Sequence, residues 1–364
     1  MFNAVVIIGL ILVAIILFTL FRVSTLVDVL KGSSKKKVTK SNGVNAGLGI
    51  VFMIGGLLLF FIYSYTEFDR YNLPLASEHG AVTDQLFWVT MAITGIVFVI
   101  TQILLFGFGW KYRYKEGNQA LFYPDNNKLE MMWTIVPAIV LTLLIFSGWR
   151  AWVDITDKAP DEAEVVEVMG YQFAWSVRYP GKDKQLGDYD FRLIDAENAM
   201  GMDFKDKASF DDFIPREIHV PKGKPVKFNI RARDVIHSVY APHFRLQMNA
   251  VPGMPTTFWF TPTKSTQDMR EETGNPEFNY ELVCNKICGK GHFAMRYLIV
   301  VDEPADYYKW YNEQQAWLAK NPSYLSSVPQ HLKEVAIISS GMENNPEVQA
   351  VTGLEEEEEM VGAF

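Results

Sequence analysis

The chain is organised around one stretch, Cys284-Asn-Lys-Ile-Cys288-Gly-Lys-Gly-His292-Phe-Ala-Met295. Four of its side chains carry donor atoms that suit a soft metal ion, and they lie at spacings of four, four and three residues. The 364-residue chain has only 2 cysteines, and both are in this stretch. A chain that uses cysteine only as one such pair uses it for chemistry.

Three interpretations compete for the cysteine pair. Two exported thiols can form a disulfide, although a pair flanked by histidine and methionine at ligand spacing is an unusual crosslink. A zinc site usually has four Cys or His ligands, with a two-residue gap inside each cysteine pair, and a thioether is a poor zinc ligand. Thiolate, imidazole and thioether together are the set that selects copper. We therefore expect a copper site.

The first part of the chain contains long apolar segments. Each is close to the ~20 residues that cross a bilayer as a helix, and none carries an internal charge before Arg150. Buried helices of a soluble core are usually shorter and have a polar face. A net charge of -8 and a pI of about 5.4 also argue against nucleic-acid binding. We expect four transmembrane helices, at Phe2–Phe21, Ala46–Tyr65, Phe87–Trp110 and Met131–Val153.

The charges of the loops predict the orientation. The loop from Thr66 to Leu86 is acidic, whereas the loops before and after it are basic, and basic loops stay in the cytoplasm. The first apolar segment lacks a basic start and a cleavage site, so we expect an anchor that is not cleaved. Everything after Trp152 is then extracytoplasmic. The basic residues are Arg22, Lys31, Lys35, Lys36, Lys37 and Lys40 in the first loop, and Lys111, Arg113, Lys115 and Lys128 in the third.

Short β-rich runs, separated by Pro and Gly turns, follow the last apolar segment. Their spacing predicts an all-β sandwich or small barrel. The metal-ligand stretch lies between the last two runs, so strands should hold both of its ends. The predicted strands are Glu164–Met169, Gln172–Tyr179, Arg216–Val220, Pro225–Arg231, Thr257–Thr261, Phe278–Val283 and Met295–Val301.

One more imidazole is needed to complete a site of two thiolates, one imidazole and one thioether. His237 is the best candidate, because it follows a predicted strand and a turn there can face the cysteine loop. His243 is the competitor. His219 lies inside a predicted strand, and we expect it to be a packing or surface residue.

Several motifs of the chain resemble those of subunit II of the haem-copper cytochrome c oxidases. The resemblance covers about residues 85 to 305, and the cysteine loop is its most specific part. It implies a cupredoxin-like domain exposed outside the membrane. The motifs are Leu129-Glu-Met-Met-Trp-Thr-Ile-Val-Pro137, Gly170-Tyr-Gln-Phe-Ala-Trp-Ser176, Val220-Pro-Lys-Gly-Lys-Pro225, Asp234-Val-Ile-His-Ser238, Ala250-Val-Pro-Gly253 and the cysteine loop itself.

The resemblance also implies a ligand set for a binuclear CuA centre of two copper ions. Two thiolates would bridge the ions, two imidazoles would each bind one, and a thioether and a backbone carbonyl would complete the set. By that resemblance the centre passes electrons from cytochrome c to a haem in subunit I of a proton-pumping oxidase, which also contains a subunit III. The implied ligands are His237, Cys284, the carbonyl of Lys286, Cys288, His292 and Met295.

Two positions depart from the family pattern. Position 286 is usually a glutamate that also holds a magnesium or manganese ion, which Lys286 cannot do. Phe173 stands where the family has the tryptophan through which electrons enter, and Trp175 follows two residues later. Glu130 matches the mouth of a proton pathway into subunit I, although a charge at a helix N-terminus is also an ordinary macrodipole effect.

Four segments are expected from these observations: 1–65 with two additional helices, 85–153 as a helical hairpin, 160–305 as the CuA domain, and 306–364 as a C-terminal helix and acidic tail. The additional helices would either dock another respiratory complex or anchor the chain in lipid. The stretch Asp203–Asp212 is expected to be a solvated insertion, with a calcium loop or a docking patch as alternatives.

The expected location is a bacterial inner membrane, with the copper domain on the periplasmic side. No Cys-x-x-Cys-His haem motif is present, so the cytochrome c donor would be a separate protein. Quinol oxidases of the same superfamily lack the copper ligands in this subunit. The alternative from another class is a membrane-tethered copper-binding or metallochaperone protein without an oxidase partner.

Overall fold

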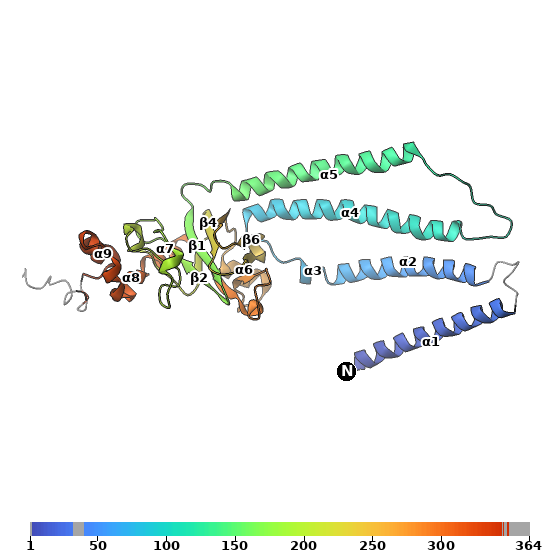
Figure 1. Ribbon diagram of the computed structural model, residues 1–364, viewed down its shortest axis with the longest axis horizontal. Helices are drawn as coiled ribbons and strands as arrows, with labels where there is room; N and C mark the ends of the chain where they lie inside the picture. The colour runs from blue at the N-terminus through green and yellow to red at the C-terminus, as the bar shows by residue number, and fades with distance from the viewer. Residues whose placement is uncertain (1, 32–39, 344, 346–347, 349–364) are drawn as a thin grey trace, which may run out of the picture. The chain divides into compact units, whose positions relative to one another are not determined.

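The computed structural model describes residues 2–31, 40–343, 345 and 348, and Figure 1 shows the order of its elements. The chain forms two compact units. Unit 1 contains Met1–Asn72 and Trp88–Leu141, and unit 2 contains Leu73–Phe87 and Thr142–Phe364. The basic residues 35–37 and the acidic run 355–359 lie outside the described residues.

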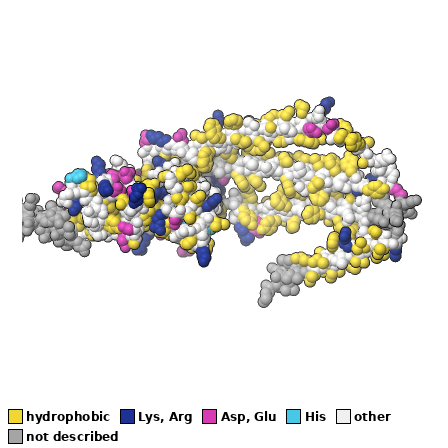
Figure 2. All heavy atoms as spheres, viewed as in Figure 1, with side chains coloured by type: hydrophobic (Ala, Val, Ile, Leu, Met, Phe, Trp, Pro, Cys, Tyr) yellow, Lys and Arg dark blue, Asp and Glu magenta, His cyan; other side chains and the backbone are white. Residues whose placement is uncertain are grey.

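The apolar segments form long helices, in the order predicted. These are α1 (Phe2–Leu30), α2 (Lys40–Thr66), α4 (Glu78–Lys111) and α5 (Asn127–Thr156), with the short α3 (Phe68–Tyr71) after α2. Among the described residues, α2, α4 and α5 are long and apolar enough to cross a membrane, whereas the apolar part of α1 is the shorter Ile11–Val27. Apolar side chains cover these helices in Figure 2. The predicted fold class is confirmed, and a span by α1 stays a prediction.

Within unit 1, two glycines of α2 lie against side chains of α4. A Cβ on Gly47 would be 3.6 Å from the ring of Trp110, and one on Gly49 would be 3.4 Å from Phe106. The rings of Phe52 and Phe106 lie 5.9 Å apart. Aromatic side chains of α4 thus rest on small residues of α2, whereas a Cβ on Gly55 or Gly56 would meet nothing within 4 Å.

Unit 2 is built on two β-sheets. One has the strand order β2-β1-β4-β7 and the other has β3-β9-β8-β5-β6. The β4 strand alternates between buried and half-buried residues over its first five positions, as expected when one sheet face covers a core. The strands are β1 (Glu164–Tyr171), β2 (Ala174–Arg178), β3 (Ile218–Pro221), β4 (Val226–Ala232), β5 (His237–Ala241), β6 (Leu246–Ala250), β7 (Thr256–Phe260), β8 (Tyr280–Cys284) and β9 (Arg296–Asp302).

The topology brings three loops to one end of this sandwich. Strand β1 runs parallel to β4, so the β1–β2 and β4–β5 loops leave at the same end. Strand β5 pairs antiparallel with β8, and Val239 is opposite Cys284. The β8–β9 loop, which carries the predicted ligands, therefore lies beside the start of β5.

All seven predicted strands form, but β5 and β6 were not predicted. A helical turn at Pro242–Phe244 and a left-handed Arg245 (φ 53°) separate these two strands, so the sequence has no continuous β-rich run there. The predicted C-terminal helix is also interrupted, forming α7 (Pro304–Asn312) and α8 (Trp317–Lys320). The remaining helices are α6 (Thr266–Thr273) and α9 (Lys333–Ser340), with 3₁₀ turns at Phe191–Leu193, Lys207–Ser209, His292–Ala294, Pro322–Ser327 and Gln330–Leu332.

Unit 2 contains two hydrophobic clusters. The larger fills the sandwich, and the smaller packs the insertion after β2 against the C-terminal helices. Phe204 of the insertion stacks on Trp317 of α8 at 5.6 Å. The insertion is therefore part of a folded lobe, and the expectation of a solvated insertion is wrong for its buried residues Asp211 and Asp212.

A buried charge cluster lies beside β1 between these clusters. Arg178 donates to Glu167 at 2.7 Å and to Asp212 at 3.1 Å. Arg231 donates to the other oxygen of Glu167 at 2.7 Å and also to the carbonyl of Met200. The cluster thus joins the sandwich to the lobe through the hydrogen bonds of two arginines.

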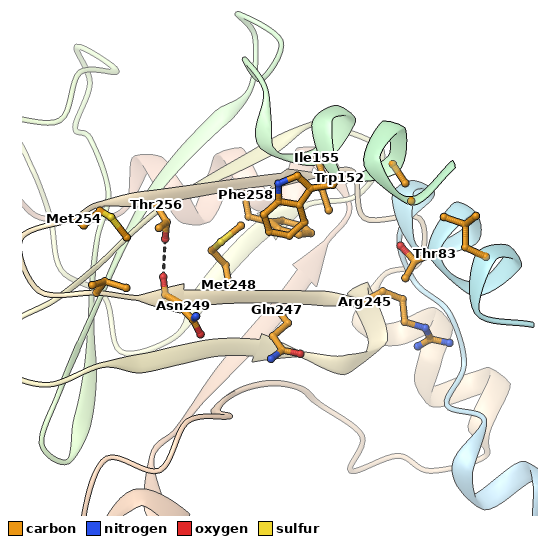
Figure 3. Close-up of a pocket in the computed structure, with 14 residues that line it drawn as sticks. Thr83, Trp152, Ile155, Arg245, Gln247, Met248, Asn249, Met254, Thr256 and Phe258 are labelled. Carbon is orange, nitrogen blue, oxygen red and sulfur yellow. Dashed lines mark hydrogen bonds between the residues drawn. The ribbon is translucent and has the colours of Figure 1, made fainter. Parts of the chain in front are cut away.

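A cavity of about 680 Å³ lies in unit 2 between the start of α4, the end of α5 and the strands β6 and β7. Trp152, Met248 and Phe258 point toward one another in it (Figure 3). At its edge, Arg245 donates to both carboxylate oxygens of Asp84, at 2.7 and 2.9 Å. This pair fastens the start of α4 to the start of β6.

Candidate metal site

His237 is the first residue of β5, and its imidazole is fully buried. Nε2 lies 2.9 Å from a carboxylate oxygen of Asp234, and Nδ1 lies 3.9 Å from Sγ of Cys284. Because a carboxylate only accepts hydrogen bonds, Nε2 carries the proton. The lone pair of Nδ1 is then directed toward the sulfur atoms, as in a metal-binding histidine oriented by a second residue.

The two cysteines are unbridged and buried, with 8% and 7% of their surfaces exposed. Cys284 ends β8, and its Sγ lies 3.2 Å from the carbonyl oxygen of Lys286. Cys288 lies in the loop, where its Sγ is 3.7 Å from Nδ1 of His292 and 3.4 Å from Sδ of Met295. The structure therefore brings all six predicted ligands together.

Met295 and Trp175 close the inner side of the site. Met295 is 1% exposed, and its carbonyl accepts the backbone N–H of Cys284 at 3.1 Å. The same carbonyl accepts Nε1 of Trp175 at 3.4 Å. The indole lies edge-on to His237 at 6.0 Å and is only 4% exposed. Trp175 thus packs beneath the ligands, away from the surface.

Phe173 covers the outer side of the loop and is 40% exposed. A Cβ added to Gly289 would lie 2.8 Å from its ring, and one added to Gly291 would lie 2.5 Å from it. Gly289 also has a φ of 140°, which side-chain-bearing residues rarely adopt. The two glycines are needed because the ring rests directly on the loop backbone.

Two pKa shifts follow from this environment. Burial, followed by the neighbouring charge of Cys284, raises the pKa of Cys288 to about 11. Burial alone would also raise the pKa of Asp234, but hydrogen bonds from the Gln172 N–H, His237 and the Val235 N–H lower it overall. The carboxylate therefore stays ionised, whereas the thiol needs a cation nearby to lose its proton at neutral pH.

The other sequence candidates lie elsewhere. The Nδ1 of His243 is 3.0 Å from the carbonyl oxygen of Pro74, and its ring packs against Phe278. His219 bonds Asp302 at 2.6 Å and stacks on Trp310, so it is a packing residue as expected. Glu130 is exposed in the first turn of α5, within unit 1.

Sequence reasoning missed three residues that organise the site. The side chain of Gln172 donates to the carbonyl of Cys288 at 2.6 Å, and its backbone N–H donates to Asp234 at 2.7 Å. Gly170 makes room for the site, since a Cβ there would lie 2.9 Å from Trp175 and 3.0 Å from His237. The Asp-x-x-His spacing was a usable signal for Asp234, whereas nothing local marks Gln172.

The donor atoms fit a soft metal ion. The ligand atoms of His237, Cys284 and Cys288 all lie within 4.8 Å of one another. Metal bonds of about 2.0–2.3 Å place two donors on one ion roughly 3.3–4 Å apart, which matches the sulfur–nitrogen distances here. Two thiols, two imidazoles and a thioether form a set that suits copper better than zinc. The domain is therefore a cupredoxin-like copper-binding domain.

Together, the fold and the site define a class: a membrane-anchored protein with a β-sandwich that carries a copper-ligand loop. Residues 66–150 match the transmembrane domain of cytochrome c oxidase subunit II, and residues 164–303 match its periplasmic domain. The chain belongs to the cytochrome c oxidase subunit II family and is accordingly a subunit of a haem-copper oxidase.

Two relatives agree with this assignment by sequence. The alternative cytochrome c oxidase subunit 2 of Bradyrhizobium diazoefficiens is 34% identical over 264 residues, which are 72% of this chain and 89% of the relative. Cytochrome c oxidase subunit 2 of Thermostichus vulcanus is 27% identical in an alignment of 318 positions that covers 72% of this chain and 84% of the relative. A crystal structure of the subunit II periplasmic domain from Bradyrhizobium japonicum is 22% identical, covers 42% of this chain and 94% of that one, and has a TM-score of 0.28.

Proposed function

We propose that this chain accepts electrons from cytochrome c at a binuclear CuA centre and passes them to haem in subunit I of a proton-pumping oxidase, where O₂ is reduced to water. The observation that carries the proposal is the convergence of His237, Cys284 and Cys288 within 4.8 Å. His292, Met295 and the carbonyl of Lys286 complete the ligand set.

Each group of residues has a role in holding the metal. Cys284 and Cys288 would hold the copper through their thiolates, and the bound metal would supply one-electron transfer with little change in geometry. Asp234 orients His237, and Gln172 fixes the loop carbonyl at Cys288. The buried Met295 and Trp175 exclude water from the inner side. A rigid, dry site of this kind lowers the reorganisation that accompanies electron transfer.

We also propose that electrons enter over Phe173, which is exposed on the loop, with Trp175 beneath it. Glu130 would mark the entrance of a proton pathway into subunit I. These roles rest on the positions of the residues in the family motifs. Since Lys286 replaces the family glutamate, its side chain would not hold an accessory magnesium or manganese ion.

The proposed setting is a bacterial inner membrane, with the copper domain on the periplasmic side. The acidic loop between α2 and α4 and the basic loop between α4 and α5 support this orientation. We propose the same four segments as above: additional helices in 1–65, a hairpin in 85–153, the CuA domain in 160–305 and a C-terminal part in 306–364. The donor would be a separate protein, and subunits I and III would be the membrane partners.

The test uses the full chain, purified in detergent without other oxidase subunits and supplied with copper. We expect two copper ions per chain and an EPR spectrum of one unpaired electron shared by two copper nuclei. One localised copper, a preference for zinc, or a disulfide between Cys284 and Cys288 in the native protein would contradict the proposal. His237→Asn should lose the shared-electron spectrum, whereas His243→Asn should keep it.

A further inference from the structure

Exposed apolar side chains surround the copper loop. We call this surface the copper-loop face. Ile287 is 87% exposed and Phe293 is 90% exposed, although both belong to a loop whose ligands are buried. Apolar side chains gathered at the surface in this way mark an interaction site. The apolar residues of the copper-loop face are Phe173, Val235, Ile236, Ile287 and Phe293.

The three loops that form this face are fastened to one another. Gln172 bonds both the carbonyl of Cys288 and the carboxylate of Asp234, so it ties the β1–β2 loop to each of the other two. Phe173 rests on Gly289 and Gly291. The apolar residues are therefore held in one arrangement before any partner binds, which reduces the ordering cost of binding.

The charges of this face are mostly positive. Arg233 on the β4–β5 loop and Lys286 and Lys290 on the β8–β9 loop are exposed, and Asp234 is the one carboxylate on the three loops. Three cations and one anion leave a net charge of +2 on loops of a chain whose net charge is -8. The carboxylate of Asp234 is also occupied by two backbone N–H groups and by His237. An approaching partner therefore meets a surplus of cations on these loops.

The carboxylates of the acidic insertion are hydrogen-bonded within the lobe. Asp206 accepts the N–H groups of Asp188 and Ala208, and Asp203 accepts that of Lys205. Asp211 accepts the N–H of Asp183, and Asp212 pairs with Arg178. These carboxylates are used to build the turns of the lobe. On the three loops themselves, Arg233, Lys286 and Lys290 outnumber the single carboxylate.

We propose that the copper-loop face docks an electron-donor protein through an acidic surface with an apolar centre. The inference rests on the proposed function, because it assigns the donor's charge for the same site. Complementary charge would steer the donor to the face, and the apolar contacts of Ile287 and Phe293 would hold it over Phe173. A donor with a lysine-rich face would be repelled by Lys290 and Arg233.

The test measures second-order rate constants for reduction of the purified oxidase by two cytochromes c of similar potential, one acidic and one basic. We expect the acidic donor to react faster at low ionic strength and to slow as salt is added, because screening weakens attraction. The basic donor should show no such decline. A faster basic donor whose rate falls with salt would overturn the proposal.

Lys290→Glu provides the residue-level test. We expect it to lower the rate with the acidic donor roughly three- to tenfold at low salt, and to raise the rate with the basic donor. Lys224→Glu is the matched control: Lys224 is exposed and lies just before β4, whereas Arg233 follows its other end, about 20 Å away along the strand. Equal effects of the two variants would overturn a local docking face.

Two further measurements separate the possible failures. EPR of the same preparations reports whether the metal centre is intact. If the unmodified protein lacks the shared-electron spectrum, the proposed function fails, and the donor's charge is not what has been tested. Amine modification of Lys290 in the oxidase, measured by mass spectrometry, should be blocked when the acidic donor is added but not when the basic donor is added. Protection before any donor is added would show that another subunit covers the face, which would overturn the proposal.

Discussion

At the scale of single residues, Asp234 connects two loops and a metal ligand with one carboxylate. One oxygen accepts the N–H of Gln172 at 2.7 Å, and the other accepts the N–H of Val235 and lies 2.9 Å from Nε2 of His237. The carboxylate therefore fixes both the tautomer and the orientation of the imidazole.

We predict that Asp234→Asn weakens copper binding about ten- to hundredfold, because an amide fixes the imidazole less firmly than a carboxylate. Competition with a chelator of known affinity measures the change. Asp302→Asn is the matched control, since Asp302 forms a similar pair with His219 away from the site, at 2.6 Å. Equal affinities for the Asp234 variant and the unmodified protein would show that the pair does not support the metal.

At the scale of elements, α4 is fastened to the β-sandwich inside unit 2. Arg245 donates to both oxygens of Asp84 and also to the carbonyls of Leu73 and Pro242. The ring of His243 also bonds the carbonyl of Pro74, which follows Leu73 in the segment just before α4. The side chains of Arg245 and Asp84 are 17% and 28% exposed, so the pair is only partly screened by water.

Asp84→Ala should destabilise unit 2 by about 1–3 kcal/mol, because it leaves a partly buried guanidinium without its charged partner. Resistance to proteolysis and the thermal midpoint of the sandwich report the loss. For comparison, Glu67→Ala removes a pair with Arg70, whose side chain is 73% exposed, and should have no measurable effect. If both variants behave alike, the Arg245 pair does not fasten α4.

How much of the fold could be predicted also becomes clear at this scale. Long apolar segments and β-rich runs are local patterns, so the helices and seven strands could be predicted from the sequence. The strands β5 and β6 could not, because Pro242 and the left-handed Arg245 interrupt the pattern there. The six expected ligands do converge, but the contacts of Gln172 and Asp234 depend on pairing between strands that are far apart in sequence.

At the scale of the whole molecule, a buried charge cluster joins the sandwich to the lobe. Arg178 is shared between Glu167 and Asp212, and one oxygen of Asp212 has no hydrogen-bond partner among the described residues. Burial, only partly offset by Arg178, raises the pKa of Asp212 to about 8. Burial by itself would raise the pKa of Glu167. The charges and hydrogen bonds of Arg178 and Arg231 outweigh burial, so the pKa is lowered overall.

These shifts predict how stability changes with pH. An acid whose pKa is raised in the folded state binds more protons when folded, so its contribution is fully present below about pH 4 and is lost as the pH rises through about 8. We expect unit 2 to lose on the order of a few kcal/mol between pH 5 and 8 from Asp212. Glu167 affects stability at acidic pH instead. Because its pKa is lowered in the folded state, its stabilising contribution is lost as the pH falls below the range of an ordinary glutamate.

Urea unfolding followed by tryptophan fluorescence at several pH values tests this. Asp212→Asn should remove most of the decline between pH 5 and 8, because an amide does not titrate. Asp195→Asn is the control, since that aspartate is exposed and bonds the hydroxyl of Tyr324 at the surface. A decline of the same size in Asp212→Asn and the unmodified protein would assign the pH dependence to other groups.

The pairing of β9 with β3 sets the order in which the molecule can be completed. Paired residues of the two strands, such as Ile218 and Ile299, are about eighty positions apart in the sequence, and β9 comes after the cysteine loop. A chain made from its N-terminus at about 5–20 residues per second exposes Cys284 and Cys288 for some time before β9 is available. During that interval the two thiols have neither a strand behind them nor a shield from oxidants. We therefore expect metal delivery to be a late event that requires both thiols to be still reduced.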